Sequence, residues 1–344
     1  MSLQFKHFRF LAAALFVLSM SVISCNNEPN TTQQSSEIPM DPYIDSLTQE
    51  INRTPEKAVL YAQRGEAFYE LGSYDASIND LTKAIELNPE NPNFYSILAN
   101  SYLDYYQSKK ALETMRTAAE RFATDVPTLL KLSEFQMILN EHGAAIQTAN
   151  SILEVSPMNP EAFYMMGVNY KLIGDTSKAI NALQTAVEQD PDLLDGYYEL
   201  GLLWQNNGNG KLGLQYFNNA LEINPNHVPT LYAKGMYYTN RKMDNEAIEI
   251  FKQISLIDRE YADPYFNVGV IFLVYDSLKQ AYSNFNIAAE VEPTMTKAFY
   301  YRALTAEKMG NKENAIQDYQ NARNLDKEDE YLERIEKRLM ELRK

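Results

Sequence analysis

The chain has 344 residues, a formal net charge of −15 and a single cysteine. An acidic chain of this kind repels nucleic acid and anionic membrane surfaces, and it has no basic run long enough for a phosphate-backbone site. The sequence also lacks the motifs of common nucleotide-binding and hydrolytic enzymes. His142 and His227 are expected in loops of different repeats, without ligand partners at metal spacing. We therefore expect no catalysis, no cofactor and no bound metal.

The first segment, residues 1–24, is typical of a bacterial secretory signal, with two basic residues before an apolar stretch that is short for a membrane span. It ends in Val22-Ile23-Ser24-Cys25, which resembles the lipobox of bacterial lipoproteins. The resemblance implies that the signal is cleaved before Cys25 and that this cysteine carries the lipid anchor. An ordinary secretory signal with a chance cysteine, or a retained membrane anchor, remains an alternative.

The resemblance to lipoproteins also bears on location. An aspartate after the lipidated cysteine favours retention in the inner membrane, and this chain has Asn26 there. We therefore expect a protein of the cell envelope, anchored in the outer membrane. Residues 25–40 comprise the lipidated cysteine and a polar stretch that we interpret as a flexible tether, with a mean reach of about 20 Å.

The region 41–57 is predicted to form an N-terminal capping helix. Asp41 and the proline after it suit a helix cap and a first helical turn. Ile44, Leu47 and Ile51 then form one apolar face.

From residue 58 onward, small residues recur every 34 positions. They are Gly65, Ala99, Ser133, Gly167, Gly201, Gly235, Gly269 and Ala303. A fixed period of this length indicates a solenoid, in which each unit stacks on the previous one. Large apolar residues at three- and four-residue steps predict two amphipathic helices in each unit. Turns are marked by Gly72, Gly174, Gly208 and Gly310, and the second helices end before Pro89, Pro157, Pro191, Pro225 and Pro293.

The fourth unit shows most clearly that the chain resembles the tetratricopeptide repeat (TPR) family. Its signature residues are Phe163, Gly167, Tyr170, Gly174, Ala179, Leu183, Ala186 and Pro191. The resemblance implies an all-α, right-handed α-solenoid of eight repeats over 58–329. In the third repeat Gln136 replaces an aromatic residue, so we expect looser packing there. A C-terminal capping helix is predicted over 330–344, with Leu332, Ile335, Leu339 and Leu342 on its apolar face.

The resemblance further implies that the first helix of each repeat lines a concave groove, through its second, fifth, ninth and twelfth residues. In repeats four to eight the fifth positions are aromatic and the ninth positions aliphatic. These ten candidate partner-binding residues are Tyr164, Val168, Tyr198, Leu202, Tyr232, Met236, Phe266, Val270, Tyr300 and Leu304. The first three repeats carry acids instead, at Glu66, Glu70, Asp104 and Glu134.

A contiguous apolar patch on a soluble protein usually marks a partner site. We therefore expect a membrane-anchored scaffold that binds a protein or peptide, apolar at one end and basic or amide-rich at the other, for envelope assembly or recruitment. Some TPR proteins bind the C-terminal carboxylate of chaperone tails through lysines at the fifth positions. This chain lacks those lysines, so we do not expect it to bind a C-terminal carboxylate. Four alternatives stay open: rings that only stiffen the superhelix, capture of a glycan or small ligand, an enzyme, and a self-associating structural protein.

Overall fold

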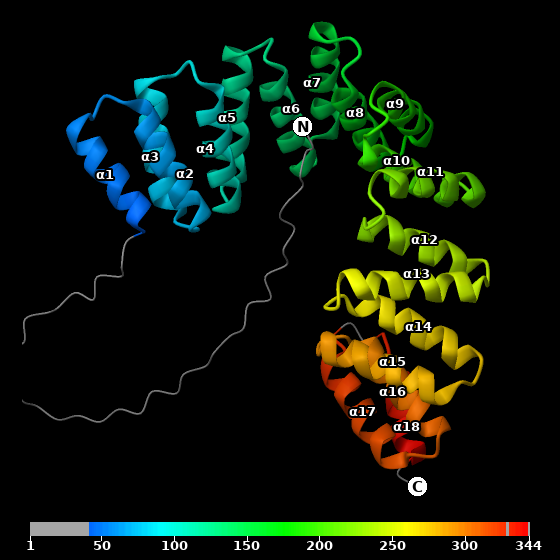
Figure 1. Cartoon of the computed structure of the whole chain (residues 1–344). Helices are drawn as coiled ribbons and strands as arrows, with labels where there is room; N and C mark the ends of the chain where they lie inside the picture. Colours follow the sequence, from blue (N-terminus) through cyan, green and yellow to red (C-terminus); the bar gives the residue numbers. More distant parts are fainter. Residues whose placement is uncertain (1–40, 328–329, 343–344) are drawn as a thin grey trace, which may run out of the picture.

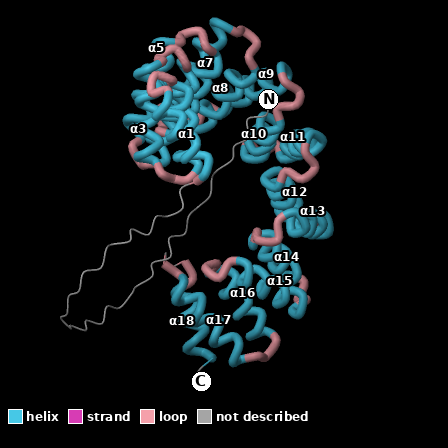
Figure 2. Tube along the Cα trace, turned by 60° about the vertical axis from the view of Figure 1, so that its left-hand side comes forward, coloured by secondary structure: helices cyan, strands magenta, loops and turns pink. Residues whose placement is uncertain are grey.

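The computed structural model describes residues 41–327 and 330–342, so the predicted signal, the lipidation site at Cys25 and the tether lie outside the described residues. The described part consists of helices joined by short loops, without strands, and the helices follow a curved path (Figure 1). The same curve, turned by 60°, is seen in Figure 2. Within this part, none of the helices combines the length and apolar character that crossing a membrane requires.

Eight helical hairpins form the solenoid. Their first helices are α2 (Ala58–Glu70), α4 (Pro92–Asp104), α6 (Val126–Ile138), α8 (Pro160–Leu172), α10 (Leu194–Asn206), α12 (Val228–Asn240), α14 (Ala262–Val274) and α16 (Thr296–Lys308). Their second helices are α3 (Tyr74–Leu87), α5 (Ser108–Arg121), α7 (His142–Val155), α9 (Thr176–Gln189), α11 (Gly210–Ile223), α13 (Asp244–Ile257), α15 (Leu278–Val291) and α17 (Lys312–Leu325). This is the all-α solenoid that the 34-residue spacing predicts.

Two further helices cover the ends. The N-terminal one, α1 (Pro42–Arg53), is capped by the Asp41 carboxylate, which accepts a hydrogen bond from the backbone N–H of Tyr43 at 2.7 Å. Its three apolar residues named above are buried. At the other end, α18 (Leu332–Leu342) buries Ile335 and Leu339 against the last repeat.

Each hairpin is closed by a left-handed residue between its two helices. Gly72 has φ +71°, and the glycines of repeats four, five and eight behave alike. In the other repeats the same turn is made by Tyr106, Asn140, Lys242 and Asp276, all with positive φ. These four residues adopt a conformation that L-amino acids with a Cβ disfavour.

The hairpins close tightly because a small residue of the first helix meets a large residue of the second. A Cβ placed on Gly235 would lie 2.7 Å from the ring of Phe251, which is fully buried. The same arrangement joins Gly201 to Phe217, at 2.3 Å. The 34-residue row of small residues therefore reflects direct helix–helix contact.

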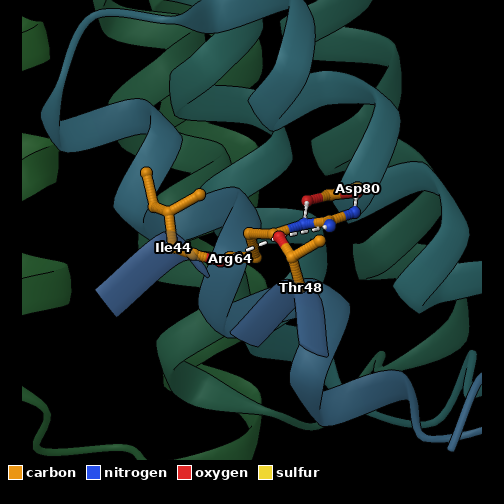
Figure 3. A network of polar contacts seen from close by, with 4 residues as sticks. All are labelled: Ile44, Thr48, Arg64 and Asp80. Atoms are coloured by element: carbon orange, nitrogen blue, oxygen red, sulfur yellow. Dashed lines mark hydrogen bonds and ion pairs between the residues drawn. The ribbon is translucent and has the colours of Figure 1, made fainter. Parts of the chain in front are cut away.

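A network of polar contacts joins the capping helix α1 to the first repeat (Figure 3). Arg64 donates two hydrogen bonds to the carboxylate of Asp80, at 2.6 and 2.8 Å, and a third to the hydroxyl of Thr48 at 3.0 Å. That hydroxyl in turn donates to the carbonyl of Ile44. The cap is thus attached by directed bonds as well as by its apolar face.

Two expectations about individual side chains were wrong or incomplete. His142 does not lie in a loop but is the first residue of α7, and its Nδ1 lies 3.0 Å from Oδ1 of Asn169. Gln136 is only 5% exposed, and its amide oxygen accepts a hydrogen bond from Thr148 at 2.8 Å. The missing ring is thus replaced by a satisfied buried polar pair.

Candidate partner-binding surface

The first helices form the inner layer of the curved solenoid. Successive first helices contact one another, as α8 does with α10 and α10 with α12. Within the described residues, second helices of neighbouring repeats make no comparably extended contact. Helices on the inside of a bend approach more closely than those on the outside, so the first helices line the concave side. The ten predicted groove residues all belong to this layer.

The fifth-position rings pack against aromatic rings of their own second helices. Ring centroids are 6.4 Å apart for Tyr198 and Phe217 and 5.9 Å apart for Tyr232 and Phe251. The pair Phe266–Phe285 repeats this contact at 5.6 Å, as does Tyr300–Tyr319 at 5.9 Å. One face of each ring is therefore covered by the protein itself.

The other side of these rings is also partly occupied. Tyr198 meets the imidazole of His227 edge-on at 5.8 Å, and Tyr232 lies 5.6 Å from Tyr261. Phe266 and Tyr300 are buried, at 9% and 8% exposure. These contacts are compatible with rings that stiffen the superhelix, the alternative left open by the sequence, while Tyr164, Tyr198 and Tyr232 stay partly exposed.

The ninth-position residues are distributed differently. Val168 is buried, whereas Leu202, Met236, Val270 and Leu304 are partly exposed. These four residues occupy equivalent positions in the successive first helices α10, α12, α14 and α16, and we call them the aliphatic row. Four of the five ninth-position residues are thus partly exposed, compared with three of the five rings.

The four acidic residues of the first three repeats differ in exposure and in pairing. Glu66, Glu70 and Asp104 are exposed, while Glu134 is half-buried and pairs with Lys131 at 3.0 Å. Asp104 accepts a hydrogen bond from the hydroxyl of Tyr69 at 2.6 Å. The exposed carboxylates give the first two repeats a negative charge that a basic segment would complement, and Glu70 and Asp104 lie at the C-terminal ends of α2 and α4, next to the hairpin turns.

Polar groups that the sequence reasoning missed lie among the rings of repeats four to six. Burial raises the pKa of Asp195 and lowers the pKa of His227, which lie near each other. Burial also raises the pKa of Tyr164 strongly. The amide of Asn267 donates to the hydroxyl of Tyr232 at 3.2 Å. Asp195 occupies a second position of its repeat, so the family's groove pattern itself could have identified it.

Ion pairs also cross between neighbouring first helices. Lys171 contacts Glu199 at 2.6 Å, and Lys297 contacts Asp263 at the same distance. Glu199 is only 13% exposed, so the first pair is held in a partly desolvated place. These pairs fix the spacing of adjacent repeats on the side where a partner would bind.

Three hollows lie away from the predicted groove. One of about 620 Å³ lies at the turns of repeats six and seven, with Met243, Ile271 and Tyr275 in its wall. A second, of about 460 Å³, opens between α3 and α5 over Tyr95 and Leu98. The third, of about 160 Å³, is polar and lies between α15 and α17. None of the ten predicted groove residues lines these three hollows.

Within 41–327 and 330–342, no three His, Cys, Asp or Glu side chains are placed to hold a metal ion.

Comparisons with known proteins agree with this architecture. A family model described as "TPR repeat" matches residues 65–104 and 170–208, and a "Tetratricopeptide repeat" model matches 297–328. The Protein SGT1 homolog of Oryza sativa subsp. japonica is 32% identical over 118 residues, which is 31% of this chain and 32% of that protein. The Protein CTR9 homolog of Arabidopsis thaliana is 30% identical over 105 residues, 30% of this chain and 10% of that protein. The matches thus span a third or less of these relatives.

Among solved structures, the APC/C hetero-tetramer Cut9–Hcn1 aligns with a TM-score of 0.53 and 17% identity, covering 86% of this chain and 58% of that one. The TPR protein YrrB aligns with a TM-score of 0.46 and 24% identity, over 57% of this chain and 99% of that one. The fold defines a repeat scaffold, a class that typically mediates protein or peptide binding. Family models identify tetratricopeptide repeats in three segments of this solenoid, 65–104, 170–208 and 297–328.

Proposed function

We propose that the protein is a membrane-anchored TPR scaffold of the cell envelope that holds a partner protein or peptide on the concave side of repeats four to eight. The observation that carries the proposal is the partly exposed aliphatic row of Leu202, Met236, Val270 and Leu304 beside rings that are already packed. Such a surface offers apolar area without ordering its own side chains on binding, which lowers the entropic cost of association.

The test compares polar substitutions in the aliphatic row with a polar substitution on a second helix. A Leu202→Gln plus Met236→Gln variant makes the row polar, and Leu256→Gln makes the same change at a residue of α13 that is 78% exposed. The full-length proteins are crosslinked in native membranes and co-purified, after circular dichroism shows equal helicity. We expect a defined partner to be captured by the wild type and the control but lost from the double variant. Equal capture by all three proteins would place the interface elsewhere.

The anchor is tested separately. Acylation of Cys25 would hold the solenoid close to a bilayer, since several acyl chains on one cysteine bind far more firmly than one. We expect the wild type to incorporate a clickable fatty acid and to sediment with membranes, and Cys25→Ser to do neither. Membrane sedimentation of Cys25→Ser without label would instead indicate a retained N-terminal helix.

A second candidate function is capture of an oligosaccharide by the same rings. It is favoured by the polar groups interleaved with them, Asp195 and the Asn267 amide that bonds to Tyr232. Sugars combine hydroxyl groups with apolar faces that stack on aromatic rings. Calorimetric titration with N-acetylhexosamine oligosaccharides distinguishes oligosaccharide capture from peptide binding. A binding heat with the wild type that is lost in Asn267→Leu supports oligosaccharide capture, and no binding heat with the wild type favours peptide binding.

A further inference from the structure

Four tyrosines gather where the helices of the first two repeats turn, away from the concave row. We call Tyr69, Tyr74, Tyr105 and Tyr106 the tyrosine patch. The ring centroid of Tyr74 lies 6.0 Å from that of Tyr69 and 6.1 Å from that of Tyr105. Tyr105 is 38% exposed and Tyr106 is 95% exposed.

The side chain of Tyr106 is 95% exposed and contributes little to packing. Tyr106 makes the left-handed turn of repeat two at φ +59°, where the first, fourth, fifth and eighth repeats have glycine. A residue with a Cβ in this conformation costs roughly 1 kcal/mol or more. Since the ring packs on almost nothing, packing does not offset this cost. A fully exposed ring in such a position is suited to contact with another molecule.

Carboxylates surround the patch and are oriented by it. The hydroxyl of Tyr105 donates to Asp75 at 2.8 Å, and that of Tyr69 donates to Asp104 at 2.6 Å. Burial and the bond to Asp104 raise the pKa of Tyr69, so this hydroxyl stays a donor at physiological pH. Both carboxylates are exposed, as is the carboxylate of Glu70, the residue after Tyr69.

Cations near the patch are fewer than acids. The exposed Lys109 and Lys110 lie in the first turn of α5, and Lys110 faces the ring of Tyr102 at 5.4 Å from its centroid. The turn of repeat seven repeats part of the arrangement, since Tyr275 donates to Asp244 at 2.5 Å. A hydrogen bond from a tyrosine hydroxyl to an aspartate therefore recurs at the hairpin turns. The first two repeats contain two such bonds, Tyr69–Asp104 and Tyr105–Asp75.

We propose that the tyrosine patch binds an arginine-bearing segment of a partner protein. A guanidinium stacks on an aromatic ring and at the same time bonds to a carboxylate through its planar fork. The patch presents both groups together, with an acidic surplus that complements the cation. Tyrosine and arginine are also the residues on which binding energy concentrates at protein interfaces. This surface lies outside the concave row and does not depend on the function proposed above.

The experiment titrates full-length protein with two fluorescein-labelled peptides, Gly-Arg-Gly-Arg-Gly-Arg-Gly and its lysine counterpart, and reads anisotropy. The variant is Tyr105→Ala with Tyr106→Gly, which changes no charge and introduces the glycine that other repeats use. Asn140→Gly makes the same turn substitution in repeat three without removing a ring. Asp75→Asn with Asp104→Asn removes the charges and keeps the rings.

We expect the arginine peptide to bind at least about fivefold more tightly than the lysine peptide. The tyrosine variant should lose this preference, Asn140→Gly and the Leu202→Gln, Met236→Gln variant should keep it, and the aspartate variant should weaken both peptides. Equal affinity of the two peptides, or a preference that survives the tyrosine variant, would overturn the proposal. Binding to phosphatidylethanolamine vesicles that depends on Tyr106, without any preference for arginine, would assign the patch to a lipid surface instead.

Discussion

Arg64 and Asp80 form a bidentate ion pair across the two helices of the first repeat, with both nitrogen–oxygen distances below 3 Å. The last repeat contains the same pair, Arg302 with Asp318, at 2.7 and 2.6 Å. In both cases the arginine also bonds to a polar side chain of the preceding helical unit, and in the last repeat this is Asn286. The two terminal repeats thus share a polar clasp that links the two helices of one repeat to the unit before it.

Breaking the clasp on one side should destabilise the last repeat. The side chains of Arg302 and Asp318 are 14% and 6% exposed, so Asp318→Asn leaves a poorly solvated cation. We expect a loss of about 3 kcal/mol. The double variant Arg302→Leu plus Asp318→Thr introduces the residues that repeat two has at the equivalent positions, Leu98 and Thr114. It should lower the free energy of unfolding by less than about 1 kcal/mol, because neither charge is then left without a partner. Amide hydrogen exchange in α16 and α17 measures both; equal losses would show that the charge pair itself is unimportant.

Lys234 occupies the position of Arg302 in repeat six but has no equivalent acid. It donates to Asn218 at 2.8 Å, while Ile250 stands where the last repeat has Asp318, and burial lowers the pKa of Lys234. Relative to Ile250→Asn, Ile250→Asp should raise that pKa and stabilise the folded state by about 1 kcal/mol at neutral pH, because a carboxylate partner then favours the charged form of the lysine. NMR titration of the lysine and urea unfolding provide the measurements, with Ile250→Asn as the uncharged control. An identical effect of both substitutions would contradict the expectation.

Gly235 should not tolerate an alanine even though alanine favours helices. Its Cβ would lie 2.7 Å from the buried ring of Phe251, so the ring or the helix must move. Overpacking of this kind costs about 1–3 kcal/mol. Gly143 in α7 has no neighbouring atom within 4 Å of its Cβ position, and Gly143→Ala should be neutral or stabilise by a few tenths of a kcal/mol. Thermal unfolding of the two variants should shift in opposite directions, or at least by clearly different amounts.

His227 should make stability depend on pH below about 6.5, its unperturbed pKa. Burial lowers the pKa of the folded imidazole, and Asp195 only partly opposes this effect. Between the folded and unfolded pKa values the unfolded chain binds more protons, so stability rises with pH in that window and is level above it. The free energy of unfolding of the wild type, relative to His227→Gln, should therefore fall as pH drops from 7 to 5. A constant difference over this range would refute the prediction.

The sequence predicted the positions of the candidate groove residues but not the burial of their side chains. The ten groove residues were expected from their positions in the repeat, and the structure places them all on the inner helices. Whether a partner binds there stays a prediction. The burial of Phe266 and Tyr300 was not predictable, because it depends on the rings of Phe285 and Tyr319, about half a repeat further along the chain.

The sequence by itself determined the repeat, its helices and its turns. These features depend on local chemistry: glycine at Gly72 for a left-handed turn, proline after five of the eight second helices, and small residues where the two helices of a repeat meet. Their period repeats without insertion, so neighbouring units must stack in one way.

Only the tertiary structure decided which side chains remain available. Tyr106 and Tyr300 are both tyrosines in helical hairpins, yet one is 95% and the other 8% exposed. Arg64 and Asp80 meet because two helices pack antiparallel, which no single helical pattern specifies. The exposure of a side chain and the choice of its ion-pair partner depend on how the helices pack. That packing is set by the close fit of side chains from several helices at once.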